Sequence, residues 1–243
     1  MSTPSRSPPI FALPGTLLDE RSLAALLQGI DARTAVLGST SHIDDEVDRL
    51  AAWAADVSGE PAVWLGHSLG GIVALHLALR HPTRVAALVL LGANARAGRD
   101  SSHTRRAAQW ALAQEQGLHA LAHSKLAPGY GLAADDAALA SLVAQANAVG
   151  LLRFAHQLAY AAQRPGLLVP LHSLTLPVLA ISGEHDTLCP PAQSDEIAAL
   201  VAQPHRAEHH CLAGAGHLFP MQQPQRTAAR LHPFLHRLKE PRP

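Results

Sequence analysis

The chain has 243 residues, and its 19 lysines and arginines are balanced by 19 aspartates and glutamates. This length suits one α/β domain with a well-buried core. Because the formal net charge is zero, no global field attracts nucleic acid or a membrane surface, and we expect neither as a partner.

Targeting and metal-binding signals are not expected either. Residues 1–9 lack the apolar core of a signal peptide, and no run of about 18 apolar residues predicts a membrane helix, so we expect a cytoplasmic protein. The two cysteines, Cys189 and Cys211, lack zinc-ligand spacing, and the neighbours His209 and His210 would point to opposite faces of a strand. We therefore expect no disulfide framework, no bound metal and no cofactor.

Strand and helix patterns alternate from the start of the chain, which predicts a mainly parallel sheet. Residues 8–13 are typical of a strand, and a helix is predicted from the cap at Asp19 to Leu26. A short strand is predicted at 34–37. Residues 44–57 then form an amphipathic pattern with acidic residues in its first turn, as the helix dipole favours.

A G-x-S-x-G motif formed by Gly66, Ser68 and Gly70 comes next. It follows the apolar run 62–65 and precedes a helical pattern that reaches Arg80, which is the strand-turn-helix setting of a nucleophile elbow. A serine hydroxyl is a weak nucleophile and has to stand on a sharp turn, where glycines avoid backbone collisions. The pattern predicts Ser68 as the nucleophile, and Gly66 and Gly70 as the elbow glycines.

Two later strand ends supply a candidate acid and a candidate base. Residues 177–182 predict a buried strand that leads to Asp186, and residues 207–212 predict a strand that leads to His217. Catalytic residues of open α/β sheets gather at such carboxyl ends. The chain order serine, acid, histidine is that of the triad on this type of fold. We predict Asp186 and His217 as the partners of Ser68.

These motifs resemble those of the α/β-hydrolase superfamily, and the resemblance runs from about Ile10 to about Leu238. It is carried by residues 66–71 (G-H-S-L-G-G) with 80–85 (R-H-P-T-R-V), by 183–190 (G-E-H-D-T-L-C-P) and by 214–217 (G-A-G-H). Within the superfamily the chain is most similar to small bacterial carboxylesterases, including those that demethylate pimeloyl carrier-protein esters. The resemblance implies a mainly parallel sheet of about six strands with helices on both faces.

The resemblance also implies a division of the chain. Residues 95–172 are alanine-rich and helical in period, and they lie where the superfamily inserts a lid. The core would then comprise residues 1–94 and 173–243. We expect the lid to form one wall of the acyl pocket, with Phe154 and Tyr160 among its apolar lining.

An oxyanion hole needs two donors, and the first is the backbone N–H of Leu69, directly after the nucleophile. The resemblance implies that the second is the Thr16 N–H, with Leu17 as the fallback. Two departures from the family pattern lie nearby. Pro14 replaces a common histidine, and residues 38–43 (G-S-T-S-H-I) replace an Asp-x-x-Gly-x-Gly-x-Ser loop.

The favoured interpretation is a serine hydrolase that cleaves small carboxylic esters through an acyl-enzyme, without a cofactor. Thioesters, lactones, carrier-protein-linked esters and C–C bonds remain alternatives on the same triad, because one fold hosts many reactions. A non-catalytic binding protein of the same fold is the third alternative, against which the intact triad argues.

The predicted lid carries more positive than negative charge. Between Arg96 and His172 there are seven basic residues and four acidic ones. A solvated helix face explains such a surplus, and this is the favoured interpretation. A docking face for an acidic partner such as an acyl carrier protein, built on Arg99, Arg105 and Arg106, is the sharper alternative.

Overall fold

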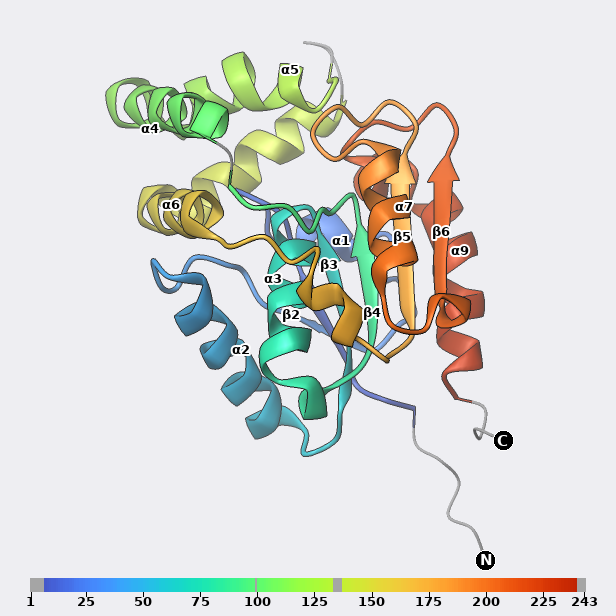
Figure 1. Ribbon diagram of the computed structural model, residues 1–243. Coiled ribbons are helices and arrows are strands. Elements are labelled where there is room, and N and C mark those ends of the chain that lie inside the picture. Colours follow the sequence, from blue (N-terminus) through green and yellow to red (C-terminus); the bar gives the residue numbers. More distant parts are fainter. Residues whose placement is uncertain (1–6, 99, 133–136, 240–243) are drawn as a thin grey trace, which may run out of the picture.

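The computed structural model describes residues 7–98, 100–132 and 137–239 and confirms the predicted fold class (Figure 1). Six strands form one parallel sheet in the order β2-β1-β3-β4-β5-β6. Because neighbours in this order are all parallel, the carboxyl ends of the strands share one edge. The strands are β1 (Ile10–Leu13), β2 (Ala32–Thr34), β3 (Ala62–His67), β4 (Val85–Leu91), β5 (Val178–Gly183) and β6 (Ala207–Leu212).

Helices cover both faces of the sheet. Strand residues alternate between two apolar clusters, so that Phe11 and Trp64 pack on one face, while Ala12 and Val63 pack on the other. The first face is covered by α2 (Ile43–Val57), α3 (Leu69–Arg80) and α7 (Pro191–Leu200), and the second by α1 (Arg21–Ala24) and α9 (Pro224–Arg237). The short elements are α8 (Phe219–Gln222), η1 (Pro82–Arg84), η3 (Pro170–Ser173) and η4 (Pro204–Arg206).

The second predicted strand differs from the structure. It was expected at 34–37, but β2 spans Ala32–Thr34 and pairs with β1 from Ile10↔Ala32 to Ala12↔Thr34. The carbonyls of Val36 and Leu37 instead accept hydrogen bonds from side chains of a distant helix, at 3.0 Å from Arg153 Nη1 and 3.0 Å from Gln157 Nε2 respectively. The strand therefore ends before Val36, because the carbonyls of Val36 and Leu37 bond to these distant side chains instead of to a neighbouring strand.

A helical insert lies between β4 and β5. It contains α4 (Asp100–Leu121), η2 (Ala122–Leu126), α5 (Ala127–Gly129) and α6 (Ala137–Gln163), which gather beside the carboxyl edge of the sheet (Figure 1). Gly117 (φ 83°) and Gly150 (φ 83°) break α4 and α6, because neither residue has helical backbone angles. The insert builds an apolar cluster of its own, which includes Leu17 and Leu218 from the core.

Helix α6 is long and apolar enough, by length and composition, to cross a membrane. Its backbone is nevertheless interrupted at Gly150, and two polar side chains, Gln145 and Gln157, are fully buried in contact with other parts of the chain. The amide oxygen of Gln145 accepts a hydrogen bond from the Asp19 N–H, and that of Gln157 from the Leu17 N–H. These contacts show that α6 packs within the folded insert and against the core.

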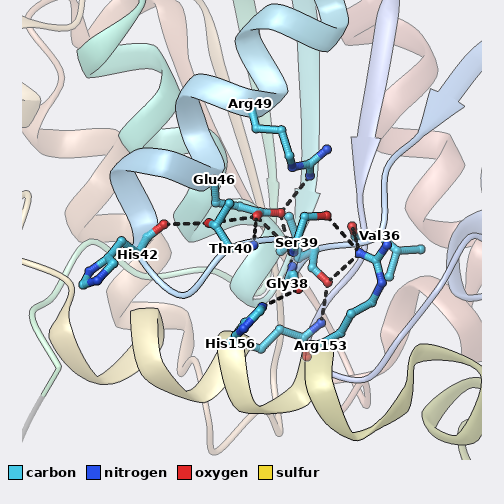
Figure 2. A network of polar contacts seen from close by, with 11 residues as sticks. Val36, Gly38, Ser39, Thr40, His42, Glu46, Arg49, Arg153 and His156 are labelled. Carbon is cyan, nitrogen blue, oxygen red and sulfur yellow. Dashed lines mark hydrogen bonds and ion pairs between the residues drawn. The ribbon is translucent and has the colours of Figure 1, made fainter.

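The loop after β2 is organised by the buried carboxylate of Glu46 (Figure 2). Its oxygens accept hydrogen bonds from the N–H groups of Gly38, Ser39 and Thr40 at 3.0–3.2 Å, and from Arg49 Nη2 at 2.8 Å. This is the segment where the sequence departs from the family pattern. A buried charge is stable only when it is paired and hydrogen-bonded, and this carboxylate meets both conditions.

Replacing this carboxylate tests its structural role. Glu46→Gln keeps the size of the side chain but loses the charge-assisted hydrogen bonds, so we expect the free energy of unfolding to fall by about 2 kcal/mol. Urea unfolding measures the change. Glu115→Gln, at an exposed position of α4, is the matched control and should change it by less than about 0.5 kcal/mol. Equal effects of both substitutions would contradict the assignment.

The turn between β3 and α3 brings three segments of backbone unusually close together. A Cβ atom at Gly66 would lie 2.3 Å from the carbonyl oxygen of Gly70, and one at Gly70 would lie 2.0 Å from that of Leu13. Both distances are far below any real Cβ contact, and the obstructing atoms are backbone. Glycine at these positions therefore lets the start of α3 approach β1.

Alanine substitutions at two glycines distinguish this steric requirement from the change in backbone entropy that any glycine-to-alanine substitution brings. Gly70→Ala should lower the free energy of unfolding by at least about 3 kcal/mol or prevent folding, because the backbone of β1 has to move. Gly59→Ala is the control, since nothing lies within 4 Å of its Cβ position, and it should change stability by less than about 1 kcal/mol. Thermal and urea unfolding of both variants measure the difference, and a stable Gly70→Ala protein would refute the close approach.

Candidate active site

Ser68 stands at the point of this turn with a left-handed backbone. Its φ is 53° and its ψ is −117°, a backbone conformation that residues other than glycine rarely adopt. The Ser68 N–H donates to the Leu91 carbonyl at 2.8 Å, and the Ser68 carbonyl accepts from the N–H groups of Gly71 and Ile72. These hydrogen bonds on both sides hold the strained residue in place, which is the condition for such strain to persist.

The structure brings the three predicted triad residues together. His217 Nε2 lies 2.9 Å from Ser68 Oγ, and His217 Nδ1 lies 2.7 Å from Asp186 Oδ2. Because a carboxylate can only accept, the Nδ1–H donates to Asp186, which leaves Nε2 free to accept the serine proton. Asp186 and His217 are both buried, while the hydroxyl side of Ser68 reaches a cavity.

Asp186 is fixed on its second oxygen as well. Oδ1 accepts hydrogen bonds from the N–H groups of Leu188 at 2.9 Å and Cys189 at 2.8 Å. Gly92 opens the space beside it, because a Cβ there would lie 3.1 Å from Asp186 Oδ2. The carboxylate therefore has a single orientation toward the imidazole ring.

Two residues that sequence reasoning missed enclose the imidazole. The Tyr130 ring stacks on His217 at a centroid distance of 5.3 Å, and the His67 ring lies 5.1 Å away. His67 Nε2 donates to the His217 carbonyl at 3.0 Å, and burial, followed by the nearby His217, lowers the pKa of His67 to about 3. His67 is therefore neutral at physiological pH. Its place inside the G-x-S-x-G motif was a usable signal, whereas nothing in the sequence pointed to Tyr130.

The two predicted oxyanion donors line the same cavity as Ser68. Leu69 begins α3, so its N–H has no partner within the helix. Thr16 lies in the loop after β1. The alternative donor, the Leu17 N–H, is not free to bind an oxyanion, because it donates to the buried Gln157 Oε1 at 3.0 Å. The geometry therefore favours Thr16 over Leu17, and Gln157 of the insert positions this loop.

The cavity has a volume of about 210 Å³, and its lining differs from the expectation. Phe154 and Tyr160 were expected in an apolar wall, but both are fully buried in apolar clusters and do not line the cavity. Their rings face the packing between the insert and the core. The cavity wall instead includes polar and charged side chains of the insert, among them Gln109, Gln157 and Arg164.

The basic residues singled out in the sequence divide into two groups. Arg99 lies outside the described residues. Arg105 and Arg106 line the cavity, together with Lys125 and Arg164. The surplus of positive charge in the insert is therefore directed in part toward the candidate nucleophile.

Within the part of the chain that the structure describes, no group of three or more His, Cys, Asp or Glu side chains could hold a metal ion. His209 contacts Ser182 and Asp195, whereas His210 contacts Glu208. Cys189 and Cys211 are free thiols. The expected absence of a metal and of a cofactor stays a prediction.

Comparisons with known proteins agree with this architecture. A family model described as "Serine aminopeptidase, S33" matches residues 31–223. An esterase from Thermogutta terrifontis has a similar structure, with a TM-score of 0.83 and 20% identity, over 96% of this chain and 90% of that chain. This likeness concerns the fold.

Curated relatives match over shorter segments. A pimeloyl-[acyl-carrier protein] methyl ester esterase of Vibrio parahaemolyticus is 41% identical over 56 residues, which are 23% of this chain and 22% of that protein. Lipase LipV of Mycobacterium tuberculosis is 53% identical over 49 residues, which are 20% of this chain and 19% of that protein. The chain thus spans about a fifth of the length of these relatives in the matched regions.

The family match covers most of the chain, and the structural relative shares the fold of this chain over nearly its whole length. The resemblance read from the three motifs is confirmed. The chain belongs to the serine aminopeptidase S33 family of α/β-hydrolases.

Proposed function

We propose that this protein is a carboxylic ester hydrolase that works through an acyl-enzyme on Ser68. The observation that carries the proposal is the continuous hydrogen-bonded chain from Ser68 through His217 to Asp186, at 2.9 Å and 2.7 Å, at the edge of a cavity. A nucleophile, a base and a group that orients the base are the parts that serine catalysis requires.

In the first half of the reaction, Ser68 Oγ attacks the ester carbonyl while His217 Nε2 takes the hydroxyl proton. The tetrahedral intermediate places its negative oxygen toward the N–H groups of Leu69 and Thr16, and these dipoles stabilise it. When the intermediate collapses, His217 returns the proton to the leaving alcohol and Ser68 is acylated. Asp186 holds the imidazole in the correct tautomer and stabilises its charged form.

In the second half, water attacks the acyl-enzyme and His217 again serves as base and then as acid. The product is a carboxylic acid, and Ser68 is restored. The stacked ring of Tyr130 and the neutral ring of His67 limit the space around the imidazole. They thereby help to keep His217 between Ser68 and Asp186 through both halves.

We further propose that residues 95–172 act as a lid over this site, with residues 1–94 and 173–243 as the core. The contribution of Gln157 and Tyr130 to the surroundings of Thr16 and His217 supports this division. The names of the curated relatives support esters as substrates, and one of them names a carrier-linked methyl ester. A carrier-linked ester is thus a narrower form of the proposal, in which an acidic acyl carrier protein is the partner.

Substitutions in the triad test the mechanism. Ser68→Ala and His217→Ala should each lower kcat by about 10⁴-fold or more, and the double variant should lose little beyond either single change, because the residues act as a unit. Asp186→Asn should also be severe, since it favours the wrong tautomer of His217. His172→Ala, at an exposed position outside the cavity, is the matched control.

Hydrolysis of p-nitrophenyl esters measures these changes, and a fluorophosphonate probe reports acylation of Ser68 directly. Multiplicative losses in the double variant would contradict the shared mechanism. A folded wild-type protein that the probe never labels would instead favour a non-catalytic binding role.

A further inference from the structure

Four cationic side chains line the cavity beside Ser68. They come from three places in the insert: Arg105 and Arg106 in the first half of α4, Lys125 in η2, and Arg164 directly after α6. Among the described residues that line this cavity there is no aspartate or glutamate. All the charged side chains that line the cavity of the candidate active site are therefore positive.

None of these four side chains forms an ion pair with a carboxylate among the described residues. Arg164 donates to two backbone carbonyls, from Nε to Arg96 at 3.0 Å and from Nη1 to Ala161 at 2.6 Å. Arg106 Nη1 is buried and has no hydrogen-bond partner within the described structure. The neighbouring Arg96 behaves differently, because it forms a two-pronged pair with Glu196 at 3.0 Å on both contacts.

Unpaired guanidinium groups in partly buried positions are unfavourable, because each loses hydration and repels the others. Burial, followed by the charges of Arg164 and Arg105, lowers the pKa of Arg106 to about 10. The guanidinium is still charged at neutral pH. An anion bound in the cavity offsets the repulsion among these cations and can accept charge-assisted hydrogen bonds from them.

We propose that the cavity recognises a small ester that carries a second, anionic group, such as the free carboxylate of a dicarboxylic acid monoester. Arg106 and Arg164 bind this group while Ser68 faces the ester carbonyl. The proposal rests on the ester hydrolase activity proposed above and names its substrate class. A volume of about 210 Å³ limits such a substrate to a short acyl chain.

Burial favours a small anion over an acidic carrier protein as the occupant. Arg105 and Lys125 are exposed and within reach of a protein surface, whereas Arg106 and Arg164 are partly buried. A docked macromolecule would contact the exposed pair. Arg106 and Arg164 instead line a cavity of about 210 Å³, which a small anion can enter and a folded protein cannot.

Matched esters test this inference. Monoethyl glutarate and ethyl pentanoate differ mainly in a carboxylate against a methyl group, and wild-type kcat/KM should be at least about tenfold higher for the former. Arg106→Gln and Arg164→Gln should each remove most of this preference, because kcat/KM should fall at least about fivefold more for monoethyl glutarate than for ethyl pentanoate. Arg106→Lys should retain part of it. Arg33→Gln, at an exposed position of β2 outside the cavity, is the control and should change neither value.

Binding of free glutarate gives a readout that does not depend on hydrolysis. Glutarate should raise the melting temperature of wild type and of Ser68→Ala, but not that of Arg106→Gln. Stronger protection by inorganic phosphate than by glutarate would identify the anion as a phosphate group. If no ester is hydrolysed but glutarate binds through Arg106, the proposed function fails while the anion site stands.

Three results would overturn the inference. The first is wild-type protein with no preference for monoethyl glutarate and no stabilisation by glutarate or phosphate. The second is an equal loss on both esters in Arg106→Gln, which would mean a disturbed cavity. The third is an effect confined to the exposed pair, in an Arg105→Gln and Lys125→Gln double variant acting on a carrier-linked ester. That result would assign the charge to docking of a carrier protein.

Discussion

The left-handed backbone of Ser68 is the constraint on which the site depends. A non-glycine residue at φ 53° persists only when its surroundings hold it, and here the Leu91 carbonyl fixes one side and the first turn of α3 the other. The close approach of Gly70 to Leu13 adds a steric limit. Because β1, β3 and β4 all meet this turn, the position of Ser68 Oγ is set by the centre of the sheet.

Most of the core could be predicted from the sequence because its signals are local. The apolar run of β4 and the elbow glycines each encode their structure within a few residues, and their order in the chain implies the parallel sheet. The same reasoning placed Ser68, Asp186 and His217 at strand ends, which in a parallel sheet share one edge. Their hydrogen-bonding distances follow from this topology, while their catalytic roles stay predictions.

The insert could not be predicted in the same detail, because its contacts are long-range. Residues 36–40 end β2 early and turn to Glu46, Arg153 and His156, and the last two lie more than a hundred residues away in the chain. Figure 2 shows how these groups converge. Tyr130 meets His217 through the same kind of contact. A helical period indicates which side of a helix is apolar, but not whether that side faces a cavity or a neighbouring helix. For this reason the prediction that Phe154 and Tyr160 line the acyl pocket was wrong.

The core and the insert thus contribute different parts of the chemistry. The core supplies a neutral His67, a buried carboxylate and backbone N–H groups, which suit any acyl transfer and carry little information about the substrate. The insert supplies charge: its four cavity-lining cations have no acidic partner among the described residues, unlike Arg80, which pairs with Asp48, and Arg96, which pairs with Glu196. A fold has no structural need for unpaired cations beside a nucleophile. In the substrate class that we propose, the second anionic group of the ester is the partner that these cations lack.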